Sequence, residues 1–122
     1  MRHSKIISLG HHVPETVITN EYLSTIMDTN NEWIVERTGI HERRWMDPAK
    51  DTVANMAAKA TRMALQRANL TEKDIEFIVF ATITPDYFFP GSGVLLQREL
   101  GLEGIAALDI RNACSGFIYA LS

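Results

Sequence analysis

Continuous apolar runs alternate along the chain with segments of helical spacing. The apolar runs predict strands at residues 5–9, 75–83 and 104–110, because a strand covered on both faces is apolar throughout. Residues 52–70 predict the longest helix, since apolar side chains recur there every three or four positions. A shorter helix is predicted at residues 92–100, and another begins just after the third strand.

The order of these elements favours an α/β fold. Strands that alternate with helices predict parallel strands with right-handed crossovers, in a β-α-β-α-β-α core. Two short helices are expected between the first strand and the long helix. Asn20 is predicted to cap the first, Thr29 or Asn30 to cap the second, and Gly39 to end it. The polar residues 41–51 predict a loop or a short extended piece.

Length and charge narrow the class of protein. The chain has 122 residues, enough for one domain, and a net charge of −3, which argues against a nucleic-acid partner. No apolar run approaches the roughly 20 residues that a membrane-spanning helix needs, and the N-terminus has no secretory signal pattern. The one cysteine cannot form an internal disulfide. We therefore expect a cytoplasmic protein in a reducing compartment.

Cys114 admits two interpretations. A lone cysteine is most often a small buried apolar side chain. Cys114, however, follows a predicted strand and precedes a predicted helix, where ligands of α/β folds bind. A free thiol with a pKa near 8.5 is only about 3% thiolate at pH 7, and a helix N-terminus lowers that pKa by about one unit at most. A nucleophilic cysteine therefore needs a basic partner, usually histidine.

The four histidines do not supply an evident partner. None of them, His3, His11, His12 or His41, falls at a predicted strand C-terminus opposite Cys114. The pair at residues 11–12 has no further ligand at metal-binding spacing, so no metal site is expected. We therefore expect the partner of Cys114 to lie outside this chain.

Trp33 and Arg37 are four residues apart, so they share one face of the second short helix. Taken alone, the tryptophan is more often a packed helix residue and the arginine a solvated surface charge. The alternative is a ligand site, in which the aromatic face stacks on a base and the guanidinium binds phosphate.

Four segments resemble β-ketoacyl-acyl carrier protein synthase III, the enzyme family that starts type II fatty acid synthesis. They are LGHHVPETVITNEYL, DTNNEWIVERTGIHERR, FATITPDYFFPGSGVLLQRELG and NACSGFIYALS, at residues 9–23, 28–44, 80–101 and 112–122. The resemblance covers essentially the whole chain. It implies the thiolase fold, which has two similar α/β halves. Residues 1–122 would form a partial N-terminal domain, with the C-terminal half absent from this chain.

The resemblance also implies a reaction and its residues. Cys114 would accept an acyl group from acyl-coenzyme A, and malonyl-acyl carrier protein would then condense with it. Coenzyme A thioester would be a substrate, with no permanently bound cofactor. Trp33 would stack on the adenine of coenzyme A, Arg37 would bind coenzyme A, and Thr29 would lie beside the adenine. Phe89, or its neighbour Phe88, would reach across a homodimer to shape the acyl pocket.

The family's catalytic histidine and asparagine belong to the half that this chain lacks. We therefore expect the chain alone to be inactive in condensation. It is interpreted as a piece of a nicked or split enzyme, a truncated product, or a short subunit that pairs with a separate chain. Two other functions stay open: another thiolase-fold condensing enzyme of secondary metabolism, and a noncatalytic interaction subunit. Either Arg43 or Arg44 is open as a contact for the acidic carrier protein.

Overall fold

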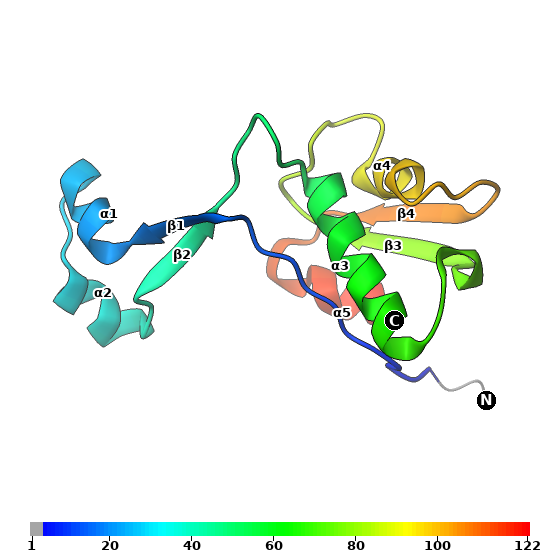
Figure 1. Ribbon diagram of the computed structural model, residues 1–122, viewed down its shortest axis with the longest axis horizontal. Coiled ribbons are helices and arrows are strands. Elements are labelled where there is room, and N and C mark those ends of the chain that lie inside the picture. Colours follow the sequence, from blue (N-terminus) through cyan, green and yellow to red (C-terminus); the bar gives the residue numbers. More distant parts are fainter. Residues whose placement is uncertain (1–3) are drawn as a thin grey trace. The chain divides into compact units, whose positions relative to one another are not determined.

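The structure is a computed structural model that describes residues 4–122. The chain forms two compact units, and each is described by itself (Figure 1). The smaller unit comprises Val13–Asp51, and of the described residues the larger unit comprises 4–12 and 52–122. Among the described residues, no helix has both the length and the apolar character that crossing a membrane requires.

The larger unit contains a parallel pair of strands. Its principal elements in chain order are α3 (Val53–Ala68), β3 (Phe77–Ala81), α4 (Ser92–Glu99), β4 (Ala106–Ile110) and α5 (Gly116–Leu121). Strands β3 and β4 pair in parallel, with Phe77 opposite Ala106 and Ala81 opposite Ile110. The predicted order of strands and helices from residue 52 onward is confirmed.

Alternation along the strands gives this sheet two different faces. Ile78 is buried in the apolar core with Ala58 of α3, with Leu96 of α4 and with Leu100, which directly follows α4. The neighbouring residue Val79 faces the other way, because successive side chains of a strand point to opposite faces. Helix α5 lies on that second side of the sheet (Figure 1). The core of the larger unit therefore lies between the sheet and helices α3 and α4.

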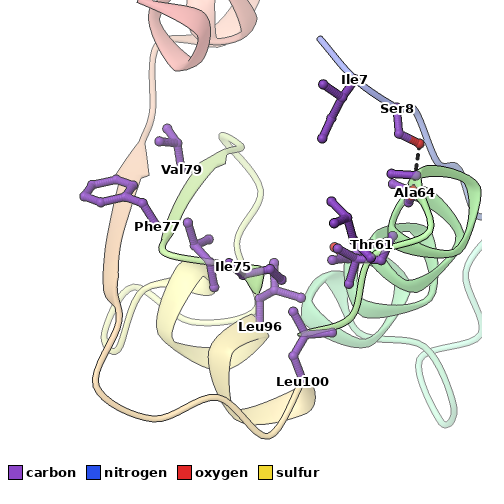
Figure 2. A pocket seen from close by; sticks show the side chains of 13 residues that line it. Ile7, Ser8, Thr61, Ala64, Ile75, Phe77, Val79, Leu96 and Leu100 are labelled. Carbon is purple, nitrogen blue, oxygen red and sulfur yellow. Dashed lines mark hydrogen bonds between the residues drawn. The ribbon is translucent and has the colours of Figure 1, made fainter. Parts of the chain in front are cut away.

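The prediction of a strand at residues 5–9 is wrong. These residues run along α3, where the Ser8 hydroxyl donates to the Ala64 carbonyl at 2.7 Å and Arg67 donates to the Leu9 carbonyl at 2.9 Å. Figure 2 shows Ile7 and Ser8 across a hollow of about 320 Å³ from β3. A strand requires a hydrogen-bonded neighbour, and within residues 4–122 the sheet contains only β3 and β4. The apolar pattern of residues 5–9 therefore does not indicate whether a neighbouring strand is present.

The smaller unit is an antiparallel pair of strands with two helices. Its elements are β1 (Thr16–Thr19), α1 (Asn20–Ile26), α2 (Asn31–Thr38) and β2 (Glu42–Trp45). Thr16 pairs with Trp45 and Thr19 with Glu42. The short extended piece predicted within residues 41–51 is β2, whereas β1 was not predicted. Its sequence, TVIT, has two adjacent apolar residues between two threonines, so it lacks the strict alternation that marks a strand.

The predicted cap is correct for α2 and wrong for α1. Asn30 caps α2 and accepts from the Trp33 N–H at 2.8 Å, and Gly39 ends that helix with a left-handed φ of 68°, as predicted. The prediction that Asn20 caps α1 is wrong. Thr19 is the cap and accepts from the Tyr22 N–H, while Asn20 is fully buried.

Candidate functional site

Cys114 lies on the turn between β4 and α5, as the sequence predicts. A single turn of 3₁₀ helix, Ala113–Ser115, leads into α5. Ala113 has a φ of 45°, in the left-handed region that alanine rarely enters, at a cost of roughly 1–2 kcal/mol. The Ser115 N–H and hydroxyl both bond to the Asn112 carbonyl, at 3.1 and 2.9 Å. This tight turn leaves the free thiol of Cys114 exposed.

An apolar groove of about 750 Å³ lies beside the thiol. Its polar lining residues besides Cys114 are Thr82 and Asn112. The other lining residues are small or apolar: Val79, Ala81, Ile83, Ile110, Ala113, Gly116, Phe117, Ala120 and Leu121. The groove could therefore hold an aliphatic chain next to the sulfur, whereas it presents neither an acid nor a base to it.

The described histidines have other surroundings. His12 lies in the larger unit with its Nε2 at 3.4 Å from the Lys59 ammonium nitrogen. His41 lies in the smaller unit, where its carbonyl accepts from the Asn20 N–H. His3 is outside the described residues. Within residues 4–122, histidine, cysteine, aspartate and glutamate side chains form no group of three that could hold a metal ion.

The aromatic loop, residues 82–91, follows β3 and is fixed by contacts at two points. Asp86 accepts from the N–H groups of Val53 and Ala54 at the start of α3, at 2.6 and 2.9 Å. Arg111 donates to the Phe88 carbonyl at 3.0 Å and lies over the Phe88 ring, 5.2 Å from its centre. Both phenylalanines are exposed, Phe88 by 90% and Phe89 by 92%. Phe88 is thus engaged by the arginine that precedes the cysteine turn, and Phe89 is presented outward.

Helix α2 brings Trp33 and Arg37 together, as their spacing predicts. The guanidinium carbon of Arg37 lies 4.5 Å from the centre of the Trp33 ring, in cation–π contact. Arg37 also lies 3.7 Å from the Glu36 carboxylate, in a pair open to solvent. Trp33 is 51% exposed, so it is not the fully packed helix residue of the plainer interpretation.

Thr29 precedes the cap of α2 and carries a buried hydroxyl. Its Oγ1 finds no hydrogen-bond partner among the described residues. A buried polar atom without a partner costs roughly 1–3 kcal/mol, so such atoms are uncommon in proteins.

A polar cluster of Asn20, Asn31 and Arg43 was not predicted from the sequence. Arg43 donates to Asn20 Oδ1 at 2.6 Å and to the Ile18 carbonyl at 3.2 Å. Arg43 is therefore half-buried and engaged within its own unit. Arg44 stays at the surface and donates to the carbonyls of Pro14 and Glu15 at 3.3 Å. The only sequence signal for the cluster was an asparagine at a helix start, which the capping rule explains equally well.

Comparisons with known proteins point to one group of enzymes. β-Ketoacyl-[acyl-carrier-protein] synthase III of Methylococcus capsulatus is 46% identical over 121 residues, covering 99% of this chain and 37% of that protein. The crystal structure of 3-oxoacyl-[acyl-carrier-protein] synthase III from Aquifex aeolicus matches with a TM-score of 0.89 and 46% identity, over 96% of this chain and 37% of that one. The priming β-ketosynthase of the R1128 polyketide pathway matches with a TM-score of 0.88 and 32% identity, over 96% and 35%.

The extent of these matches is unequal on the two sides. They take in nearly all of this chain, whereas the chain spans little more than a third of the length of its relatives. No protein-family model matches the chain.

Proposed function

Because the chain belongs to the β-ketoacyl-acyl carrier protein synthase III family, of which it corresponds to the N-terminal part, we propose that it supplies the acyl-accepting thiol and a coenzyme A-binding helix of such an enzyme. Its fold is the thiolase-like fold of these condensing enzymes, in an incomplete N-terminal half. The observation that carries the proposal is the exposed Cys114 on a strand-to-helix turn beside an apolar groove.

In the proposed first step, the Cys114 sulfur attacks the carbonyl carbon of acyl-coenzyme A. The new carbon–sulfur bond replaces the bond to coenzyme A, which leaves as a thiol after it takes up the proton that Cys114 loses. The N–H of Cys114 would donate to the oxyanion that forms, since backbone amides at such turns stabilise developing negative charge. The apolar groove supports this role, because it can shield an acyl chain from water.

In the proposed second step, malonyl-acyl carrier protein loses carbon dioxide and its carbanion attacks the Cys114 thioester. A carbon–carbon bond forms, the thiolate of Cys114 leaves, and a β-ketoacyl product stays on the carrier protein. This step needs a group that polarises the malonyl carbonyl, and the groove lining contains no histidine. We propose that the family's histidine and asparagine come from outside residues 4–122, so that the chain alone does not condense.

Helix α2 is proposed to bind the adenine nucleotide end of coenzyme A. Trp33 would stack on adenine with the ring face that Arg37 leaves open, and Arg37 would bind a phosphate. The half-exposed tryptophan and its neighbouring guanidinium support this assignment. The partnerless hydroxyl of Thr29, just before this helix, would contribute a hydrogen bond beside the adenine.

The aromatic loop is proposed to shape the acyl pocket across a homodimer. Phe89 is favoured over Phe88 for this contact, because Arg111 already holds the carbonyl and the ring of Phe88. A fixed, outward aromatic side chain also suits a protein interface.

Acylation of the thiol is the direct test. The chain is incubated with acetyl-, butyryl- and octanoyl-coenzyme A, and its intact mass is measured over time. We expect one acyl group per chain on Cys114, lost completely in Cys114→Ala. Adding the C-terminal part of the Aquifex aeolicus relative should speed acylation and permit condensation with malonyl-acyl carrier protein. Condensation by the chain alone would refute the proposal that the histidine and asparagine come from elsewhere. Equal function of Cys114→Ala in a complemented enzyme would refute the role of the thiol and favour a noncatalytic subunit.

Binding of coenzyme A tests the second part of the proposal. Trp33→Ala should weaken the affinity by about 5- to 100-fold, the range expected for one stacked base. Trp45→Phe is the matched control, because it changes the other tryptophan of the same unit. Isothermal titration with coenzyme A measures the affinity of both variants. A Trp33→Ala protein that binds as tightly as Trp45→Phe would contradict the role of Trp33.

A condensing enzyme of polyketide synthesis is the second candidate. The likeness to the R1128 priming β-ketosynthase supports it, although the identity of 32% is lower than the 46% shared with 3-oxoacyl-[acyl-carrier-protein] synthase III from Aquifex aeolicus. The mass spectra separate the two candidates by the acyl groups that Cys114 accepts fastest and by the product formed with the complemented enzyme.

A further inference from the structure

We propose that Asn20 is the positioning residue for the Trp33–Arg37 face of α2, because its one side chain holds both ends of that helix. This role rests on the proposed coenzyme A site. None of the hydrogen bonds found for Asn20 is to Trp33 or Arg37. Asn20 is fully buried at the first position of α1.

The amide nitrogen of Asn20 makes both contacts. It donates to Asn31 Oδ1 at 3.0 Å and to the Ile40 carbonyl at 2.8 Å. Asn31 is the first residue of α2, and Ile40 directly follows Gly39, the residue that ends the helix. The two bonds therefore fix the helix at its start and just past its end.

The orientation of the Asn20 amide is set by Arg43. Arg43 donates to Asn20 Oδ1 at 2.6 Å, and a guanidinium can only donate. The oxygen must therefore face Arg43, which leaves the NH₂ group for the two acceptors at the helix ends. Arg43 is itself held by its bond to the Ile18 carbonyl, and the Asn20 N–H donates to the His41 carbonyl at 3.3 Å.

Helix α2 depends on such bonds because little else fixes it. It has eight residues, too few for stability on its own, and Ile34 is its one buried residue. Val35 beside it is half-buried, and such apolar contacts restrict rotation and tilt less than two directional bonds at opposite ends do. Trp33 and Arg37 lie between those bonds, so a shift of the helix would move the ring and the guanidinium together.

Asn20→Asp is the sharpest variant. The carboxylate keeps the acceptor for Arg43, whereas both donors to α2 disappear and the Ile40 carbonyl then faces a negative oxygen. Hydrogen exchange followed by mass spectrometry should show the amides of α2 exchanging about 10-fold faster, as expected from the loss of two buried hydrogen bonds. The affinity for coenzyme A should fall by a similar factor, about 10-fold.

Two variants serve as matched controls. Ile18→Val removes a methylene from a buried side chain of the same unit and leaves every bond of Asn20 in place. It should lower the stability of the unit without selective loosening of α2 and without weaker binding. Asn31→Asp keeps an acceptor for Asn20, so it should behave as the wild type, whereas Asn31→Ala should show about a 3-fold effect. The last variant carries the test if Asn20→Asp does not fold.

The outcomes separate this inference from the proposed function. Selective loosening of α2 and weaker binding in Asn20→Asp and Asn31→Ala support it. Unchanged exchange of α2, or effects no larger than those of Ile18→Val, overturn it. If Trp33→Ala leaves coenzyme A affinity unchanged, the proposed binding site is refuted. Exchange then decides the role of Asn20 alone: loosened α2 amides support it, and unchanged ones overturn it.

Discussion

Different interactions stabilise the interior of each of the two compact units. Residues 13–51 have a polar centre, where the buried Asn20 bonds to the side chains of Asn31 and Arg43. The larger unit has an apolar cluster, where Ala58 and Ile78 pack with Leu96 and Leu100. Directional bonds fix orientation, whereas apolar packing contributes most of the stabilisation that burial provides.

This difference matches the two candidate sites. The α2 site has its supporting bonds within its own unit, and its ring and guanidinium already touch in the free chain. The Cys114 site has a turn and an apolar groove, and that groove lacks a base. Binding by α2 is therefore testable in this chain alone, whereas the proposed condensation needs further groups.

Leu96→Ala should produce the largest effect on stability. Leu96 is 6% exposed in the apolar core, and truncating a buried leucine to alanine costs about 2–5 kcal/mol. Urea unfolding measures the loss, and hydrogen exchange locates it. We expect it in α3, α4 and the parallel strands. An equal loss of protection in α1 and α2 would contradict separate stabilisation of the two units, because they would then unfold as one.

Arg43→Met should cost about 2–3 kcal/mol in the smaller unit. The change leaves Asn20 Oδ1 and the Ile18 carbonyl without their donor, and buried acceptors without partners are costly. Arg44→Met is the matched control. Its two bonds lie at the surface, where water replaces them, so a change within about 0.5 kcal/mol is expected. Equal losses in thermal unfolding would show that the polar centre has no special weight.

Gly91→Ala should cost about 1–2 kcal/mol in the larger unit. A Cβ at Gly91 would overlap Asp109 Oδ2, and Asp109 accepts from the Gly93 N–H at 3.1 Å at the start of α4. The carboxylate would have to move and lose this bond. Gly93→Ala places a Cβ at 3.2 Å from the same oxygen and gains helix propensity, so it should be nearly neutral. A Gly91→Ala protein as stable as Gly93→Ala would show that this polar cap contributes nothing to the apolar unit.

Asp74→Asn should have the smallest effect, and that effect should depend on pH. Hydrogen bonds from the Thr71 N–H and hydroxyl lower the pKa of Asp74 below its ordinary value of 3.8. The ionised carboxylate therefore stabilises the fold above about pH 4, and this contribution is lost as the pH falls through the lowered pKa. The difference in Tm between wild type and Asp74→Asn should shrink from pH 6 to pH 2.5. A constant difference would contradict a role for the charge.

Local patterns in the sequence were sufficient for much of the larger unit. The parallel strands, the long helix and the position of Cys114 follow from apolar runs, helical spacing and strand-to-helix order. The pairing of Trp33 with Arg37 also followed from a spacing of four. The strand predicted at residues 5–9 failed, because strand formation needs a neighbour that local pattern cannot supply. Strand β1 was missed for the converse reason: its pairing with β2, and not its own pattern, makes it a strand.

The nucleophile candidate and the residue pair on α2 could be predicted before folding, since each depends on residue type and short-range spacing, and the family resemblance came from four segments of the chain. The remaining features arise only from tertiary contacts. These contacts bury Asn20 against the Asn31 side chain and the Ile40 carbonyl, pair Arg43 with Asn20 and Arg111 with Phe88, and hold Ala113 at a positive φ beside the exposed thiol. These features join residues far apart in the chain or require the surrounding fold to hold a strained backbone, and no local pattern encodes either.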